Sequence, residues 1–208
     1  MACAVTQLVE RELIRLKFCA IVSTASKFFL PFLILGLTLS TACIQRHSQL
    51  EVYDTVPAFT MTTSSGAPFD GKQLRGKVWV ADFIYTNCPG PCPLMTSKMH
   101  KLQMQVKNDS DVQLVSFSVD PHRDTPAVLN AYAKHFDGPT ADWVFLTGND
   151  ATTHLLAHDV FRVGDLIGVM DHSTQFILVD KHDTIRGYYS SFDKDDMRKL
   201  VTDLQSLR

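Results

Sequence analysis

Residues 77–99, KVWVADFIYTNCPGPCPLMTSKM, contain the pattern that decides the fold. Residues 77–85 are β-branched, aromatic and almost wholly apolar, which is typical of a strand covered on both faces. Beyond the two cysteines, an apolar stripe at helical spacing consists of Met95, Met99, Leu102 and Val106. The stretch therefore predicts a buried strand, a tight turn and an amphipathic helix that begins near Pro93.

The sequence downstream continues this alternation of strands and helices. The segments with the apolar, β-branched character of strands are 112–119, 143–147, 175–179 and 184–189, of which the last two predict a hairpin. Capping residues predict helices that begin at Pro126 after Thr125, at Asn149 or Asp150, and after Asp193. The order predicts an α/β, thioredoxin-like domain: a central mixed sheet flanked by helices, with an inserted late hairpin.

The composition excludes several classes of protein. The chain has 208 residues, with 20 Lys and Arg against 22 Asp and Glu, and 45% of its residues are hydrophobic. These values exclude a collagen, a coiled coil and a wholly disordered chain. The balanced charge also argues against a nucleic-acid partner, because a nucleic-acid binder needs a basic face.

An uncharged segment near the N-terminus predicts export. Residues 28–45, FFLPFLILGLTLSTACIQ, contain no charged side chain and follow Lys27, as in a secretory signal segment. Residues 39–43, LSTAC, resemble the lipidation site of a bacterial lipoprotein, with Cys43 as the lipidated residue. An uncleaved membrane anchor and a buried helix are the alternatives. We expect residues 1–45 to be the signal, lipoprotein or anchor segment, 46–54 a tether, and 55–208 the thioredoxin-like domain.

Cys88 and Cys92 are the two cysteines of the expected domain, since the other three precede residue 45. Two nearby thiols in an oxidising compartment indicate a redox pair or a metal site. Cys92 is expected at the N-terminus of the helix, where free N–H groups and the helix dipole favour a thiolate. We therefore expect a lowered pKa for Cys92, in the form that attacks disulfides and binds metal.

The donor types favour copper over zinc. A closed zinc site has four protein ligands, mostly Cys and His, and the expected domain contains no third cysteine. Two thiolates and one imidazole suit copper. The other candidate histidines are His100, which is expected to be too distant, His47 in the tether, His122, and four that are expected on the surface: His135, His154, His158 and His182. His172 precedes the strand at 175–179, and its position alone leaves its role as a ligand open.

Three blocks resemble the SCO/SenC family of copper proteins: DFIYTNCPGPCPLM, SVDPHRDTP and DHSTQFILVD. The similarity extends from about Val52 to the C-terminus. It implies a thioredoxin-like fold and anchoring to the energy-transducing membrane of a bacterial cell envelope, with the domain facing the periplasm or outer side. It also implies that one copper ion, Cu(I) or Cu(II), is bound by Cys88, Cys92 and His172.

The resemblance leaves two functions open. The first is a copper chaperone that takes copper from a donor protein and delivers it to the dinuclear copper centre of cytochrome c oxidase, in the copper-receiving subunit. The alternative is a thiol–disulfide oxidoreductase that keeps the cysteines of that centre reduced, which would make the protein an enzyme. A peroxiredoxin-like peroxidase is a weaker third hypothesis.

Other residues of the matching blocks are expected to be structural. Asp120, Arg123 and Asp124 are expected to brace the loop before the helix at Pro126, with a role around the metal ligands as the alternative. Met95 and Met99 are expected in the core rather than at the metal, because they belong to the apolar stripe.

Overall fold

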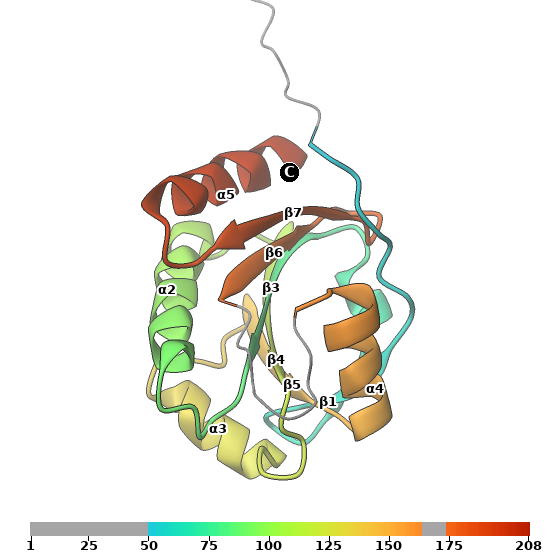
Figure 1. Ribbon diagram of the computed structural model, residues 1–208, viewed down its shortest axis with the longest axis vertical. Coiled ribbons are helices and arrows are strands. Elements are labelled where there is room, and N and C mark those ends of the chain that lie inside the picture. The colour runs from blue at the N-terminus through green and yellow to red at the C-terminus, as the bar shows by residue number, and fades with distance from the viewer. Residues whose placement is uncertain (1–49, 164–173) are drawn as a thin grey trace, which may run out of the picture. The chain divides into compact units, whose positions relative to one another are not determined.

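The computed structural model describes residues 50–163 and 174–208, which form one mixed sheet with helices on both faces (Figure 1). The strands are β1 (Thr60–Thr63), β2 (Pro68–Asp70), β3 (Val78–Ile84), β4 (Val112–Ser118), β5 (Trp143–Thr147), β6 (Gln175–Val179) and β7 (Ile185–Ser190). The helices are η1 (Gly71–Leu74), α2 (Pro91–Val106), α3 (Pro126–Lys134), α4 (Asp150–His154), η2 (Leu155–Val160) and α5 (Lys194–Leu207). The sheet order is β2-β1-β5-β4-β3-β6-β7.

The strand β3 lies inside the sheet and organises both layers. It pairs with β4 in parallel and with β6 in antiparallel register, where Ala81 faces Ile177. All seven residues of β3 are buried, as expected of a strand covered on both faces. The thioredoxin-like fold class, the mixed sheet and the late β6–β7 hairpin are thereby confirmed.

Successive side chains of β3 point to opposite faces and divide the core into two layers. Val78, Val80 and Ile84 belong to a cluster that also contains residues of α2, α3 and α5. Trp79, Ala81 and Phe83 belong to a second cluster, which includes residues of η2. Figure 1 shows α2 and α3 on one side of the sheet and α4 on the other.

Most element boundaries lie within one or two residues of those predicted. The strands β5 and β6 span the predicted residues, whereas α2 begins at Pro91 rather than near Pro93. Gly90 is the N-cap, and the proline after it suits the first helical position, where no N–H is needed. The β1–β2 hairpin was not predicted, because its strands are short, largely polar and at the sheet edge.

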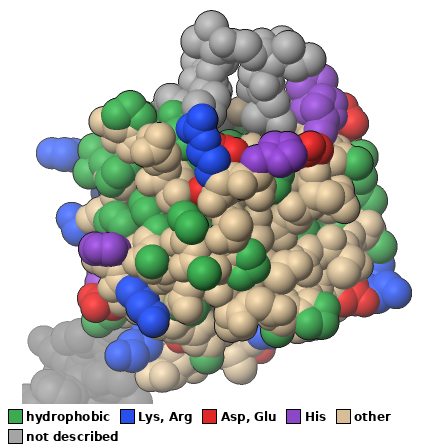
Figure 2. All heavy atoms as spheres, turned by 90° about the horizontal axis from the view of Figure 1, so that it is seen from below, with side chains coloured by type: hydrophobic (Ala, Val, Ile, Leu, Met, Phe, Trp, Pro, Cys, Tyr) green, Lys and Arg blue, Asp and Glu red, His purple; other side chains and the backbone are tan. Residues whose placement is uncertain are grey.

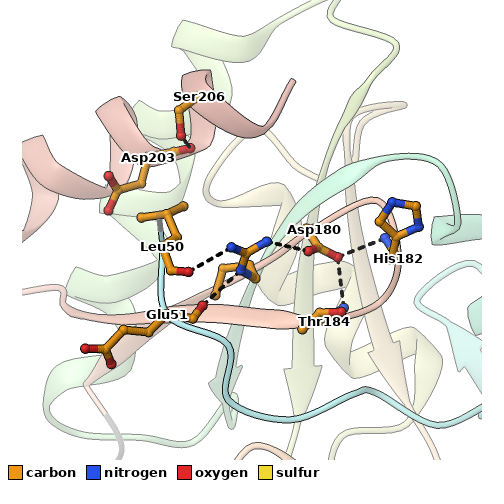
Figure 3. A network of polar contacts seen from close by, with 8 residues as sticks. Leu50, Glu51, Asp180, His182, Thr184, Asp203 and Ser206 are labelled. Atoms are coloured by element: carbon orange, nitrogen blue, oxygen red, sulfur yellow. Dashed lines mark hydrogen bonds and ion pairs between the residues drawn. The ribbon is translucent and has the colours of Figure 1, made fainter. Parts of the chain in front are cut away.

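The hairpin β6–β7 is closed by a turn that Asp180 organises. Its carboxylate accepts hydrogen bonds from the backbone N–H groups of His182 and Thr184 and from the Arg186 side chain (Figure 3). Burial disfavours the charged carboxylate, but these donors outweigh that effect and lower the pKa of Asp180.

Arg186 also joins the first described residues to this hairpin. Its guanidinium donates to the carbonyl oxygens of Leu50 and Glu51, at 2.8 and 2.9 Å (Figure 3). The Tyr53 N–H donates to the carbonyl of Ile185. From Leu50 onward, the segment expected to be a tether therefore lies against β7. Among residues 50–163 and 174–208, no helix has both the length and the apolar character needed to span a membrane.

Candidate metal centre

The turn between β3 and α2 holds Cys88 and Cys92. The Cys88 N–H donates to the Tyr85 carbonyl oxygen, 3.3 Å away, and this hydrogen bond forms a tight turn just after β3. Cys92 is the second residue of α2. Both are free thiols, and their exposed fractions are only 6% and 1%. The strand–turn–helix stretch was predicted, and it places the two thiols together in the core layer under α2, which was not predicted.

The N-terminus of α2 acts on Cys88 rather than on Cys92. The backbone N–H of Cys92 donates to the sulfur of Cys88, with the nitrogen 3.5 Å from Sγ. Burial opposes ionisation of Cys88, but hydrogen bonds from the Cys92 side chain and from the backbone N–H groups of Cys92 and Gly90 outweigh it and lower the Cys88 pKa.

Cys92 has the opposite electrostatics, so the prediction that its pKa is lowered was wrong. Burial is the main cause that raises the pKa of the Cys92 thiol, and the neighbouring Cys88 thiol adds to it. The helix N-terminus stabilises negative charge on the sulfur that its N–H groups face. That sulfur belongs to Cys88, four residues before Cys92. The pair therefore consists of one thiol whose pKa is lowered and one whose pKa is raised.

Asp82 lies in β3 beneath the cysteine turn and is fully buried. Burial raises the pKa of its carboxyl group to about 7, and the Ser116 side chain offsets only part of this effect. Its charge also contributes to the raised pKa of Cys92. The sequence analysis did not single out Asp82, although a lone carboxylate in an otherwise apolar strand was a usable signal.

Asp124 ties the turn to the end of β4. Its buried carboxylate accepts hydrogen bonds from the Thr86 hydroxyl at 2.5 Å, from the Thr86 N–H at 3.1 Å and from the Ser118 hydroxyl at 2.6 Å. The bracing predicted for this block is thus seen, and it reaches the residues that lead into Cys88. Thr125 caps α3 by accepting from the Val128 N–H.

We expect Asp124→Ala to lower the free energy of unfolding by about 3 kcal/mol, because it leaves the buried Ser118 hydroxyl and the half-buried Thr86 donors without their charged acceptor. Urea unfolding of the metal-free, reduced protein measures this change. Asp124→Asn is the matched control, since it keeps one acceptor oxygen and should cost less. A loss below about 1 kcal/mol in the alanine variant would show that the brace contributes little.

The predicted ligand His172 and the tether residue His47 lie outside the described residues. His135, His154, His158 and His182 are on the surface, as predicted. Met95 and Met99 are completely buried, which confirms their assignment to the core.

Comparison with known proteins gives a consistent result. The sequence matches the family model described as SCO1/SenC over residues 47–207. It is 42% identical over 97 residues to the SCO1 protein homolog of Bacillus subtilis, a match that covers 46% of this chain and only half of that protein. It is 30% identical over 160 residues to a SCO2-like protein of Rickettsia typhi, covering 70% of this chain and 77% of that one.

Solved structures with the same fold include three informative relatives. A SCO1/SenC family lipoprotein from Bacillus anthracis superimposes with a TM-score of 0.66 at 35% identity, covering 79% of this chain and 99% of that one. BsSco, in which a disulfide switch was identified, gives 0.66 at 30% identity, with coverage of 76% and 96%. Copper-bound ScoI of Bradyrhizobium japonicum gives 0.60 at 26% identity, with coverage of 73% and 98%.

Proposed function

Because the chain belongs to the SCO1/SenC family, we propose that it is a copper chaperone that binds one copper ion through Cys88, Cys92 and His172. The observation that carries this proposal is the pair of buried, free thiols at the start of α2, where the backbone N–H of Cys92 donates to the Cys88 sulfur and helps to lower its pKa. Thiolate and imidazole are the ligands that copper prefers among protein donors. The copper-bound ScoI structure supports the same metal.

The register of the sheet supports His172 as the third ligand. The strand β6 runs antiparallel to β3, and Ala81 pairs with Ile177. In antiparallel register, three residues forward from Ala81 along β3 is Ile84, and three residues back from Ile177 along the chain is Thr174. Thr174 is therefore level with Ile84, at the end of β3 that leads into Cys88. His172 is two residues before Thr174, within about 7 Å of chain length. The sheet therefore brings Thr174 to the end of β3 from which the cysteine turn leaves, which supports the proposal for His172.

Copper is the cargo of this site in the proposed function. The Cys88 thiolate offers the first sulfur, whereas Cys92 must lose its proton when the metal binds, so affinity falls as the pH is lowered. The donor protein and the copper-receiving subunit of cytochrome c oxidase are the proposed partners. A partner related to cytochrome c oxidase is supported by BsSco, whose family is described as cytochrome c oxidase assembly proteins.

The proposed location is the bacterial cell envelope. Residues 1–45 anchor the chain as a lipoprotein or membrane segment, residues 46–54 form the connection, and the domain at 55–208 faces the periplasm or outer side. The uncharged residues 28–45 and the lipoprotein relative from Bacillus anthracis support this arrangement.

A copper titration of the reduced, full-length chain tests the proposed site. We expect one equivalent of Cu(II) to produce a thiolate-to-copper charge-transfer band, which reports the cysteine site alone. His172→Ala should lower the copper affinity at least tenfold and leave the titration of both thiols unchanged, because it removes a ligand far along the chain from the cysteines. His135→Ala, an exposed histidine on the described surface, is the matched control. An unchanged affinity in His172→Ala would contradict the three-ligand site.

Thiol–disulfide exchange is the second candidate, favoured by the opposite pKa shifts of the two thiols. The Cys88 thiolate attacks a disulfide of the target, forms a mixed disulfide and releases one target thiolate. Cys92, after losing its proton, attacks Cys88 and releases the second target thiol. Two electrons thus pass to the target while a Cys88–Cys92 disulfide forms. This activity should survive in His172→Ala, which separates it from copper transfer.

A further inference from the structure

A second group of metal-ligating side chains lies at the end of α4 and in η2. It consists of His154, His158 and Asp159, and we call it the η2 cluster. The helix η2 packs into the core layer that contains Trp79 and Phe83, whereas both cysteines belong to the other layer. The η2 cluster is therefore on the opposite side of the sheet from the cysteine turn and shares no ligand with it.

The geometry of the η2 cluster fits one ion. The two imidazole rings stack with centroids 4.9 Å apart and planes inclined by 25°. The Asp159 carboxylate reaches both, at 2.9 Å from His158 Nδ1 and 4.0 Å from His154 Nδ1. Three ligand atoms, one from each residue, lie within 4.8 Å of one another.

Small side-chain rotations would complete such a site. Ligand atoms bound to one ion at about 2.0–2.2 Å lie at most about 4.4 Å apart. The side chains retain exposed fractions of 47% for His154, 43% for His158 and 53% for Asp159, which leaves them room to rotate and the ion access from solvent.

The local fold presents these side chains on a fixed backbone. His154 is the last residue of α4, and the chain continues into the wider π-helical turns of η2. Leu156, Ala157 and Val160 point into the core and hold the backbone of η2. The histidines, four residues apart, therefore share the solvent-facing side. A π-helical turn inside a helix is frequently found at functional sites.

The charges around the η2 cluster favour a cation. Asp150, four residues before His154, forms an ion pair with His122 at 3.0 Å. Within the part of the chain that the structure describes, the ion pairs of Asp159 are with histidines alone, so no lysine or arginine neutralises it. Figure 2 shows histidine and acidic side chains side by side on the surface, toward its upper right.

We propose that His154, His158 and Asp159 form a surface site for one divalent first-row metal ion, separate from the thiolate site. Two imidazoles and one carboxylate suit Cu²⁺, Ni²⁺ and Zn²⁺ better than Ca²⁺ or Mg²⁺, which prefer oxygen ligands alone. By the general order of affinities, Cu²⁺ binds more tightly than Zn²⁺. This proposal does not depend on the function proposed for the cysteines.

Calorimetric titration with Cu²⁺, and in parallel with Zn²⁺, tests the η2 cluster in the untagged, full-length Cys88→Ser/Cys92→Ser chain. This background removes the thiolate site, and Cys3, Cys19 and Cys43 are also replaced by Ser so that no thiol remains to bind either ion. We expect one equivalent of each ion and tighter binding of Cu²⁺. The copper EPR spectrum should show nitrogen hyperfine coupling, and the absorption spectrum should show no thiolate-to-copper band. Adding His154→Ala and His158→Ala should weaken binding at least tenfold, whereas adding His135→Ala should not change it.

Asp159→Asn provides a variant of the same size, with an expected loss of several-fold in affinity because it removes the anionic ligand. Circular dichroism checks that each variant is folded. The proposal is overturned by the absence of metal binding in the background chain, by unchanged affinity after removal of both histidines, or by an equal loss in His135→Ala. Unchanged affinity in Asp159→Asn would overturn the three-ligand assignment.

Discussion

Oxidation of Cys88 and Cys92 to a disulfide is expected to abolish copper binding by the proposed site. A disulfide sulfur carries no thiolate charge, and copper would then retain at most one of its three proposed ligands. The turn already brings the backbone N–H of Cys92 to the Cys88 sulfur, so the two residues can be linked with little movement of α2. The expected change is from one bound equivalent to none.

The measurement compares copper content of reduced and oxidised protein after removal of loosely held metal with a chelator. Cys3, Cys19 and Cys43 are replaced by Ser so that the Cys88–Cys92 disulfide is the single intramolecular bond that can form. His154→Ala and His158→Ala are included to remove the η2 cluster. Reduction should restore one equivalent. Retention of one equivalent by the oxidised protein would contradict the proposed thiolate ligation.

Asp82→Asn is expected to stabilise the metal-free protein at alkaline pH. The folded pKa of Asp82 is about 7, above the ordinary value of 3.8, so the folded state holds a proton that the unfolded state releases between these values. The stability that this group contributes is therefore present at low pH and lost as the pH rises to about 7. About three pKa units correspond to about 4 kcal/mol, which is an upper estimate for a buried group.

Urea unfolding of reduced wild type and Asp82→Asn at pH 4 and pH 8 measures this effect. The stability of Asp82→Asn relative to wild type should increase by about 3–4 kcal/mol between the two values. Asp137→Asn is the control: its side chain has an exposed fraction of 87%, and because an exposed ion pair such as its 3.7 Å pair with His100 contributes at most about 1 kcal/mol, its relative stability should change by no more than that. The same relative stability at pH 4 and pH 8 would show that Asp82 is not protonated on folding.

Raising the pH above about 7 places a negative charge at Asp82, under the cysteine turn. That charge disfavours ionisation of Cys92. Asp82→Asn should therefore also lower the pKa of Cys92, while Cys88 keeps its hydrogen bonds from α2. The buried carboxylate thus helps to keep the two thiols in different protonation states.

Much of the fold follows from local sequence patterns. Residues 143–147 and 175–179 are short apolar runs bounded by turn residues, and both were predicted with the boundaries that β5 and β6 have. The N-caps Thr125 and Asp193 were recognised because a cap depends on residues only two or three positions apart. The β1–β2 hairpin was missed because its two strands are short and largely polar, so they lack the apolar pattern that identifies a strand.

By itself, the sequence determined that Cys88 and Cys92 stand at a strand-to-helix turn, because spacing and proline placement are local properties. Only the tertiary structure decided which sulfur ionises, since that depends on burial and on where the first N–H groups of α2 point. It also decided that Asp124 braces Thr86, 38 residues earlier. A pKa is set by solvation and by charges in space, and a contact between distant residues is set by sheet register, so neither can be read along the chain.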